Sequence, residues 1–206
     1  MKNKNSNKTS IRPATMADVP AMSSLVCTSL AEEAAWKRLC PPKQEVESLL
    51  AEAMTNRRKH VMVLEDDTNG VVVSASVWEE ADEQRHPSTA ALSSCTTADD
   101  DKDDKAACLA LRLLATRPDC QRRGYGRALA SWGVRRAGKR SVPVCVLAAE
   151  RGYILFSGMG FVDRGLVSLG GGGADDDEDG DVCVKTMVLQ PLPSRRLRVA
   201  KLLSLR

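Results

Sequence analysis

The sequence predicts an α/β domain in which a central mixed β-sheet is flanked by helices. Apolar residues follow helical or strand spacing in the order helix, helix, hairpin, strand, helix, strand, helix, strand, strand. The alternating strand–helix–strand units indicate parallel strands joined by crossover helices, whereas the hairpin and the last two strands add antiparallel pairs. Of the 206 residues, 43% are hydrophobic and 28% are charged, which is enough apolar material to bury one core.

The N-terminal part of the chain is expected to contain a short extended segment and two helices. Residues 11–14 form the extended start, and Asp18 then precedes an apolar helical stripe that continues to Leu30. The two prolines at 41–42 interrupt the chain. A second apolar stripe follows over residues 46–54 and predicts the second helix.

A β-hairpin is expected next. Residues 60–65 and 71–78 are rich in β-branched residues, and the turn between them ends in Gly70. Residues 79–105 are polar and finish in a run of aspartates. We expect this segment to be a disordered insertion, because it has too little apolar surface to bury.

The second half of the chain carries the crossover units. Residues 108–116 are apolar except for Arg112, which is typical of a central strand. The elements expected after it are a basic loop at 117–123, a helix at 124–138, a buried strand at 142–148, a short helix at 151–158, and strands at 161–169 and 182–189.

These elements define one domain over residues 10–190. Residues 1–9 are expected to be a disordered tail, and residues 191–206 a basic tail. The polar segment 79–105 and the acidic segment 170–181 are expected to be flexible insertions within the domain.

The composition argues against several classes of protein. The net charge is only +3 and aromatic residues are 3% of the chain, so the basic face and stacking aromatics of a nucleic-acid-binding protein are not indicated. No apolar run reaches the roughly 18 residues that a membrane span needs. The seven cysteines form no C-x-x-C pair, which favours free thiols in a reducing compartment. We expect a cytoplasmic protein and leave the nucleus open.

A phosphate-binding loop is indicated between the strand at 108–116 and the helix after it. The first N–H groups of a helix have no intrahelical partner and lie at the positive end of the helix dipole. Gly124 and Gly126 allow the backbone to approach a ligand closely. Arg122, Arg123 and Arg127 add positive charge that offsets a pyrophosphate.

The spacing of the glycines narrows the choice of ligand. A Walker loop is absent, because no G-x-x-x-x-G-K-[ST] occurs. A dinucleotide fingerprint needs a third glycine three residues after Gly126, where this chain has Leu129. Glu150 does follow the next strand, where a ribose-binding acid would stand, so a nucleotide-binding oxidoreductase remains a remote alternative.

Residues 113–129, with the core Gln121-Arg122-Arg123-Gly124-Tyr125-Gly126, closely resemble motif A of the GNAT superfamily of N-acetyltransferases. Residues 147–161 resemble motif B of the same superfamily, and the start at Ile11-Arg12-Pro13-Ala14 with Asp18 is similar to its usual opening. The resemblance covers about residues 11–190. The sequence as a whole also resembles fungal members of the superfamily.

The resemblance implies that the protein is an N-acetyltransferase with acetyl-CoA as co-substrate. Backbone N–H groups around Gly124 would hold the CoA pyrophosphate, and the edge of the strand at Leu114 and Thr116 would pair with the pantetheine amides. An amine acceptor would attack the acetyl group directly, where this strand separates from residues 142–148. The predicted cofactor-binding residues are Leu114, Thr116, Gln121, Arg122, Arg123, Gly124, Tyr125, Gly126 and Arg127.

The chain departs from the superfamily pattern at the catalytic positions. The tyrosine that often protonates the leaving thiolate falls on Phe156, and a polar motif B residue falls on Ala149. Tyr153, one helical turn before Phe156, is the candidate acid. The positions that often carry the general base match Ala110 or Arg112, neither of which can act as a base. The nearest candidates for the base are Glu79 and Glu80, after the strand that is expected to end at Trp78, and Glu79 is the residue predicted.

Other sequence features leave the partners open. Asp175, Asp177 and Asp179 match the start of a calcium-binding loop, but Thr186 stands where that loop needs a glutamate, so no metal site is predicted. The acceptor is an amine on a small molecule or a protein, and the sequence allows a monomer or a homodimer. The alternative function is a CoA-binding GNAT-like domain with impaired catalysis and a regulatory or interaction role.

Overall fold

The computed structural model describes residues 9–33, 36–37, 42–66, 70–81, 108–168 and 183–191. Its helices are α1 (Val19–Leu30), α3 (Lys43–Thr55), α5 (Tyr125–Arg140) and α6 (Glu150–Ser157), with short 3-10 turns η1 (Met16–Asp18) and η2 (Pro118–Cys120). Its strands are β1 (Thr9–Pro13), β2 (Lys59–Asp66), β3 (Val71–Ala81), β4 (Cys108–Thr116), β5 (Val144–Ala148), β6 (Val162–Ser168) and β7 (Cys183–Leu189).

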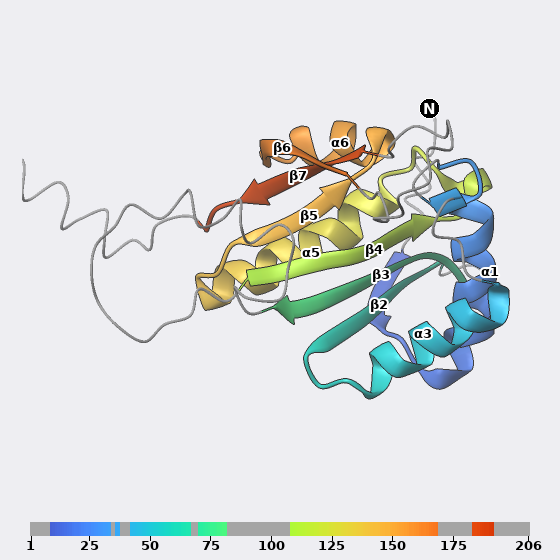
Figure 1. Cartoon of the computed structure of the whole chain (residues 1–206). Coiled ribbons are helices and arrows are strands. Elements are labelled where there is room, and N and C mark those ends of the chain that lie inside the picture. The colour runs from blue at the N-terminus through green and yellow to red at the C-terminus, as the bar shows by residue number, and fades with distance from the viewer. Residues whose placement is uncertain are drawn as a thin grey trace, which may run out of the picture.

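The strands form one seven-stranded sheet in the order β1-β2-β3-β4-β5-β7-β6 (Figure 1). Only β4 and β5 are parallel, and every other neighbouring pair is antiparallel. The predicted α/β fold with a mixed sheet is therefore confirmed. The order of elements also matches the prediction. Helix α5 forms the expected crossover between the two parallel strands.

Helices cover both faces of the sheet, and alternate strand residues serve the two cores. The larger core packs α5 and α6 against one face, and its members include Trp78, Leu111, Leu129 and Phe156. The second core packs α1 and α3 against the opposite face of β2, β3 and β4 (Figure 1). None of the described helices is long and apolar enough to cross a membrane.

Helix α5 lies close to the sheet because it carries a glycine where it crosses β3. A Cβ atom on Gly133 would stand 2.2 Å from the ring of Trp78, which is fully buried. The indole nitrogen Nε1 donates to Ser76 Oγ at 3.1 Å, so the ring is also held from the strand side. This packing fixes the position of α5, and with it the position of the helix N-terminus.

The start of the chain is held by an ion-paired turn. Arg12 Nη1 donates to Asp18 Oδ2 at 2.8 Å, and Arg12 also pairs with Glu65 of β2. Asp18 Oδ2 accepts from the backbone N–H of Thr15 at 2.7 Å, which closes a capping box before α1. The hydrogen bond from Arg12 holds the pKa of the Asp18 carboxyl well below its usual range.

The hairpin strand β3 is longer than predicted. It continues to Ala81, so residues 79–81 belong to the strand and not to the expected insertion. They pair with the first residues of β4, where Glu79 lies opposite Ala110 and Ala81 opposite Cys108. The sequence did not show that β3 continues past Trp78, because Glu79 and Glu80 are polar and follow no strand pattern. The remaining parts of the predicted tails and insertions, at 1–8, 82–105, 170–181 and 192–206, lie outside the described residues.

Candidate cofactor and acceptor site

The two parallel strands separate after a short contact. β4 and β5 pair through Leu109 with Val144, Ala110 with Cys145, and Leu111 with Val146. Beyond Leu111, β4 continues to Thr116 without a partner on this side among the described strands, whereas the end of β5 pairs with β7. The sheet therefore opens between β4 and β5, and one edge of β4 is free.

The backbone groups on this free edge belong to the predicted residues Leu114 and Thr116. Arg117 N–H donates to Val73 of β3 at 2.9 Å, and because backbone groups alternate along a strand, those of Leu114 and Thr116 point away from β3. The carbonyl of Thr116 accepts from Ser29 Oγ at 2.9 Å and from Gln121 Nε2 at 3.2 Å. Thr116 thus also ties the end of α1 to the loop that follows β4.

Arg112 lies at the point where the strands separate, and it interrupts the ladder on the other side of β4. Val77 pairs with Leu113 and Trp78 pairs with Leu111, so Arg112 is an extra residue that has no partner in β3. This arrangement is a β-bulge, which bends the strand and redirects the side chain of the extra residue. The bulge and the opening of the sheet therefore coincide.

The N-terminus of α5 lies next to the free edge of β4. The loop before it turns through left-handed conformations at Arg122, with φ of 61°, and at Gly124, with φ of 86°. Among the described residues, the backbone N–H groups of 122–127 donate to no backbone carbonyl. These donors, at the positive end of the helix dipole, form an anion-binding arrangement.

Gly126 allows the start of α5 to lie close to β4. A Cβ atom on Gly126 would lie 3.5 Å from Thr116 Oγ1, 3.8 Å from Leu114 Cδ2 and 4.0 Å from Leu155 Cδ2. Three elements therefore converge on one glycine: β4 and α5, which carry predicted cofactor-binding residues, and α6. The donor set and the narrow approach fit a pyrophosphate followed by a slender chain that lies along β4.

The arginines of the loop are exposed, and their hydrogen bonds order the loop. Arg123 Nη2 donates to the carbonyl of Asp119 at 3.2 Å, and Arg127 Nη2 donates to the carbonyl of Gly158 at 3.2 Å. Arg117 pairs with Asp119, and its hydrogen bond lowers the pKa of that carboxyl from 3.8 to about 2. Each guanidinium has more donors than these bonds use, so positive charge remains at the helix N-terminus.

The candidate base Glu79 lies beside Arg112 on the face of the sheet opposite α5. Glu79 Oε2 accepts from Arg112 Nε at 2.6 Å. Both side chains are partly exposed, at 26% for Glu79 and 33% for Arg112. Arg112, which interrupts the apolar pattern of the strand and stands at one of the positions that often carry the general base, therefore places the carboxylate of Glu79 at the point where β4 and β5 part.

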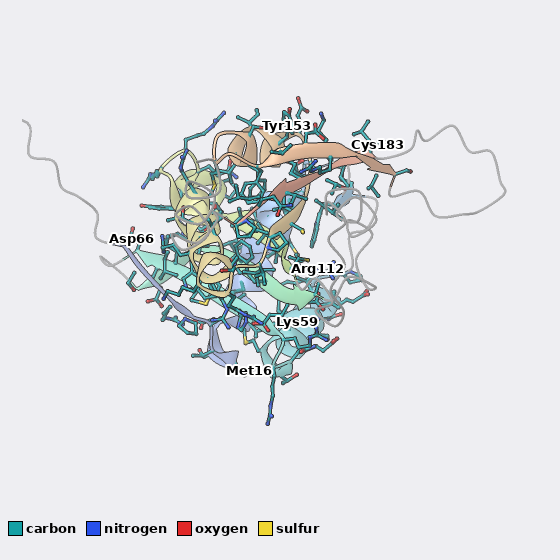
Figure 2. The ribbon with its side chains drawn as sticks, turned by 90° about the vertical axis from the view of Figure 1, so that its left-hand side faces the viewer. Met16, Lys59, Asp66, Arg112, Tyr153 and Cys183 are labelled. Atoms are coloured by element: carbon teal, nitrogen blue, oxygen red, sulfur yellow. The ribbon has the colours of Figure 1, made fainter. Side chains whose placement is uncertain are left out.

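The candidate acid Tyr153 lies on the other face, over β7. Lys185 Nζ lies 4.4 Å from the centre of the Tyr153 ring, and Lys185 also pairs with Asp163 at 2.5 Å. Figure 2 shows Tyr153 on the outer side of the molecule, well apart from Arg112. Leu155, which approaches Gly126, is two residues further along α6 and therefore points roughly 200° away from Tyr153. The two predicted catalytic side chains are not brought together.

Phe156, at the position expected for tyrosine, belongs to the core. It is buried, and its ring packs edge-to-face against Phe161 with centroids 5.2 Å apart. An aromatic pair of this kind stabilises the end of α6 against the sheet. Phenylalanine at this position therefore has a packing role.

One polar residue near the opening was not singled out as part of a site from the sequence. Thr186 of β7 is 1% exposed, and its hydroxyl Oγ1 has no hydrogen-bond partner in the part of the chain that the structure describes. It lies opposite Leu147, which follows the last residue of β5 that pairs with β4. The sequence alone could not predict that Thr186 lies here, because a single threonine within an apolar strand forms no motif. Its place is known only from the pairing of β7 with β5.

The fold matches solved acetyltransferases over nearly its whole length. A protein from Corynebacterium glutamicum described as "histone acetyltransferase HPA2 and related acetyltransferase" superposes with a TM-score of 0.63 at 22% identity, covering 90% of this chain and 98% of the other. The ribosomal-protein-S18-alanine N-acetyltransferase of Escherichia coli gives 0.60 at 18% identity, covering 91% and 97%. A GNAT superfamily phosphinothricin acetyltransferase from Sinorhizobium meliloti, solved with acetyl-CoA, gives 0.62 at 15% identity, covering 89% and 88%.

The chain has the GNAT fold. No family model matches the sequence, and no curated protein matches it closely. The seven-stranded sheet that opens between β4 and β5, with α5 beginning beside β4, is thus the GNAT arrangement carried by a sequence of low identity to these structures.

Proposed function

We propose that the protein is an acetyl-CoA-dependent N-acetyltransferase that acts on an amine by direct transfer. The observation that carries this proposal is the meeting of two unpaired sets of backbone groups. The free N–H groups at the start of α5 and the free edge of β4 lie side by side around Gly126. The first set suits a pyrophosphate, and the second suits the amides of a pantetheine chain.

The residues that would hold acetyl-CoA are those of the loop and of the free strand edge. The N–H groups around Gly124 and Gly126 would bind the phosphates, and Arg122, Arg123 and Arg127 would neutralise their charge. The backbone of Leu114 and the N–H of Thr116 would pair with the pantetheine, while the bonded Thr116 carbonyl keeps the strand end in place. The Sinorhizobium meliloti protein, which has the same fold, was solved in complex with acetyl-CoA, and this supports acetyl-CoA as the ligand of the proposed site.

The chemistry would take place where β4 and β5 separate. Nitrogen of the acceptor attacks the acetyl carbonyl, the carbon–sulfur bond breaks, and the amine loses one proton while the thiolate gains one. The carboxylate of Glu79 is positioned by Arg112 to accept the proton from the amine. The role of Tyr153 as the acid stays a prediction, because its position over Lys185 gives no support for it.

Binding of acetyl-CoA can be tested by calorimetric titration of the purified chain. We expect micromolar binding that is lost in Gly126→Trp, because the large side chain fills the space between Thr116, Leu114 and Leu155. Gly138→Trp is a matched control. It makes the same substitution in the same helix at an exposed position, where nothing lies within 4 Å of the added Cβ atom.

Other outcomes separate the alternatives. Absence of binding to the unaltered protein contradicts the proposal. Binding of acetyl-CoA without acetylation of any amine in a broad acceptor screen indicates the CoA-binding domain with impaired catalysis, an alternative suggested by Phe156 and Arg112. Tight binding of NADH in the same titration supports the oxidoreductase alternative.

A further inference from the structure

An ion pair joins two helices that lie on opposite faces of the sheet. Glu33 follows the end of α1, and its Oε1 lies 3.4 Å from Nε of Arg151, in the first turn of α6. Helix α1 packs in the core on one face, whereas α6 packs with α5 in the core on the other face. Side chains from opposite faces of a sheet meet only beyond the strands or through a gap between them.

Both members of the pair are anchored to strand ends that have separated. Ser29, near the end of α1, donates through Oγ to the carbonyl of Thr116 at the end of β4. The backbone of Glu33 is held in the turn after α1 by hydrogen bonds at both its N–H and its carbonyl. Arg151 follows the last residue of β5 by three positions. The pair therefore links the end of β4 to the end of β5, across the opening of the sheet.

The same pair completes a ring of contacts around the free edge of β4. Arg151 and Leu155 are four residues apart, so they share one side of α6. A Cβ atom on Gly126 would lie 4.0 Å from Leu155 Cδ2 and 3.5 Å from Thr116 Oγ1, which brings α6, α5 and β4 together. In order, the ring passes through Glu33, Arg151, Leu155, Gly126, Thr116 and Ser29.

The path proposed for the cofactor passes through this ring. The N–H groups of 122–127, which suit the pyrophosphate, lie beside Gly126. The pantetheine chain would then follow the edge of β4 from Thr116 towards Arg112, where the sheet begins to open. A chain that reaches this point from the phosphates has α5 and α6 on one side and the end of α1 on the other. The ion pair lies across it.

The ion pair is the contact of the ring that opens most easily. The side chain of Arg151 is 66% exposed and can swing into water, whereas that of Glu33 is 18% exposed and its backbone is fixed. Ser29, by contrast, is buried where it bonds to β4. An ion pair with one exposed member contributes only modestly to stability, so it breaks and forms again readily.

We propose that Glu33 and Arg151 form a clasp that holds the bound pantetheine chain against β4 and sets the rate at which acetyl-CoA dissociates. The two residues act by position, since neither contacts the reacting atoms. The chain must leave the ring to dissociate, so opening of the clasp contributes to the barrier. This inference rests on the proposed acetyltransferase function and adds the residues that retain its cofactor.

The test measures how fast acetyl-CoA leaves the protein. Acetyl-CoA that carries a fluorophore on its adenine is bound and then displaced by excess unlabelled acetyl-CoA, and stopped-flow fluorescence anisotropy gives the dissociation rate constant. Glu33→Arg and Arg151→Glu each bring like charges together and should raise this constant roughly three- to fivefold, the scale of one partly exposed ion pair. The double variant restores the pair with its charges exchanged, so its constant should return to within about twofold of the original.

The directions of these changes separate the clasp from a general effect of charge. Acetyl-CoA is an anion, so attraction alone would slow its dissociation from Glu33→Arg and speed its dissociation from Arg151→Glu. The clasp predicts faster dissociation in both. Changes in opposite directions, no change in either single variant, or a double variant that is not restored overturn the inference.

Glu32→Arg is the matched control. Glu32 precedes Glu33, its side chain is 77% exposed, and it pairs with Lys37 of the same stretch of chain. The same change of charge here breaks an ion pair that does not cross the opening, so the dissociation rate constant should stay within about twofold. An increase equal to that of Glu33→Arg contradicts the clasp. Should a charge reversal prevent folding, Glu33→Gln removes the charge without repulsion and is expected to raise the constant about twofold.

The outcome for the cofactor is read separately, by calorimetry with acetyl-CoA on the unaltered chain. If acetyl-CoA does not bind, the acetyltransferase proposal fails and the clasp fails with it. If acetyl-CoA binds and its dissociation does not depend on the pair, only the inference about the clasp fails.

Discussion

Glu79 and Glu80 are consecutive residues of β3 with nearly equal exposure, and their carboxylates are held in different ways. Their side chains are 26% and 24% exposed, but they point to opposite faces of the sheet. Glu80, on the α5 face, meets three basic residues. His60 Nε2 lies 3.0 Å from Oε1, Arg136 Nη2 lies 3.4 Å from the same atom, and Arg140 also pairs with it.

Among the described residues, Glu79 has one basic partner, Arg112, whose Nη1 and Nη2 groups donate to no other described residue. The difference teaches that the number of neighbouring charges, rather than burial, separates a structural carboxylate from one that is available for chemistry. A carboxylate surrounded by cations is a poor proton acceptor, because its charged form is already stabilised. Glu80 therefore ties α5 to β2 and β3, and Glu79 remains available at the opening of the sheet.

The largest expected difference between the two residues is kinetic. Glu79→Gln removes the proposed proton acceptor and is expected to lower kcat for acetyl transfer about 100-fold, the lower range for loss of a general base. The free energy of unfolding should change by less than about 1 kcal/mol, as is usual for a partly exposed ion pair. Steady-state assays at saturating acetyl-CoA give kcat, and an unchanged kcat would show that Glu79 is not the base.

Glu80→Gln is expected to show the opposite pattern. Loss of the charged acceptor leaves His60, Arg136 and Arg140 without their shared partner, and the chain should lose about 1–3 kcal/mol of unfolding free energy. Urea denaturation measures this loss. The dissociation constant for acetyl-CoA should stay the same, because Glu80 lies near the C-terminal end of α5, away from the loop. Weakened cofactor binding in a folded Glu80→Gln variant would contradict the separation of the two roles.

The smallest expected effect is a change of stability with pH. Desolvation raises the pKa of the Glu80 carboxyl, but hydrogen bonds from Arg140 and His60 outweigh it and lower the pKa from 4.5 to about 2. A depressed pKa stabilises the folded state fully above the unfolded value, and this contribution is lost as the pH falls from about 4.5 to about 2. The difference in unfolding free energy between the unaltered chain and Glu80→Gln should shrink over this window, and a constant difference would contradict the assignment.

The sequence predicted the fold well because the apolar pattern changes period at each element. The loop at 121–127 was predictable for a local reason, since two glycines and three arginines between a buried strand and a helix indicate phosphate binding. The structure places Gly126, at the start of α5, beside Leu114 and Thr116 of β4. Which of them contact acetyl-CoA stays a prediction.

The acceptor side of the site was predictable only in part: the sequence analysis named Glu79 as the candidate base, but not how it is held. Arg112 interrupts an apolar strand, and a sequence does not show that such a residue is the extra one in a bulge. Glu79 was assigned to a loop because a polar pair at the end of a strand has the composition of a loop. Thr186 gains its interest only from pairing with β5, which is a contact between residues far apart in the chain.

The extra residue in β4 also affects how the strand tolerates length changes. Ala110 and Leu113 face the same side of the sheet although three positions separate them, because Arg112 takes up the odd position. Removal of the Arg112 codon would therefore leave every other β4 side chain on its present face, and Leu111 and Leu113 would become ordinary neighbours in a continuous ladder. At this one point, β4 can lose a residue without a shift in register. Deletion of Arg112 alone would convert the bulged strand into a regular strand, remove the charged side chain at the opening and leave the core residues of β4 on their present faces.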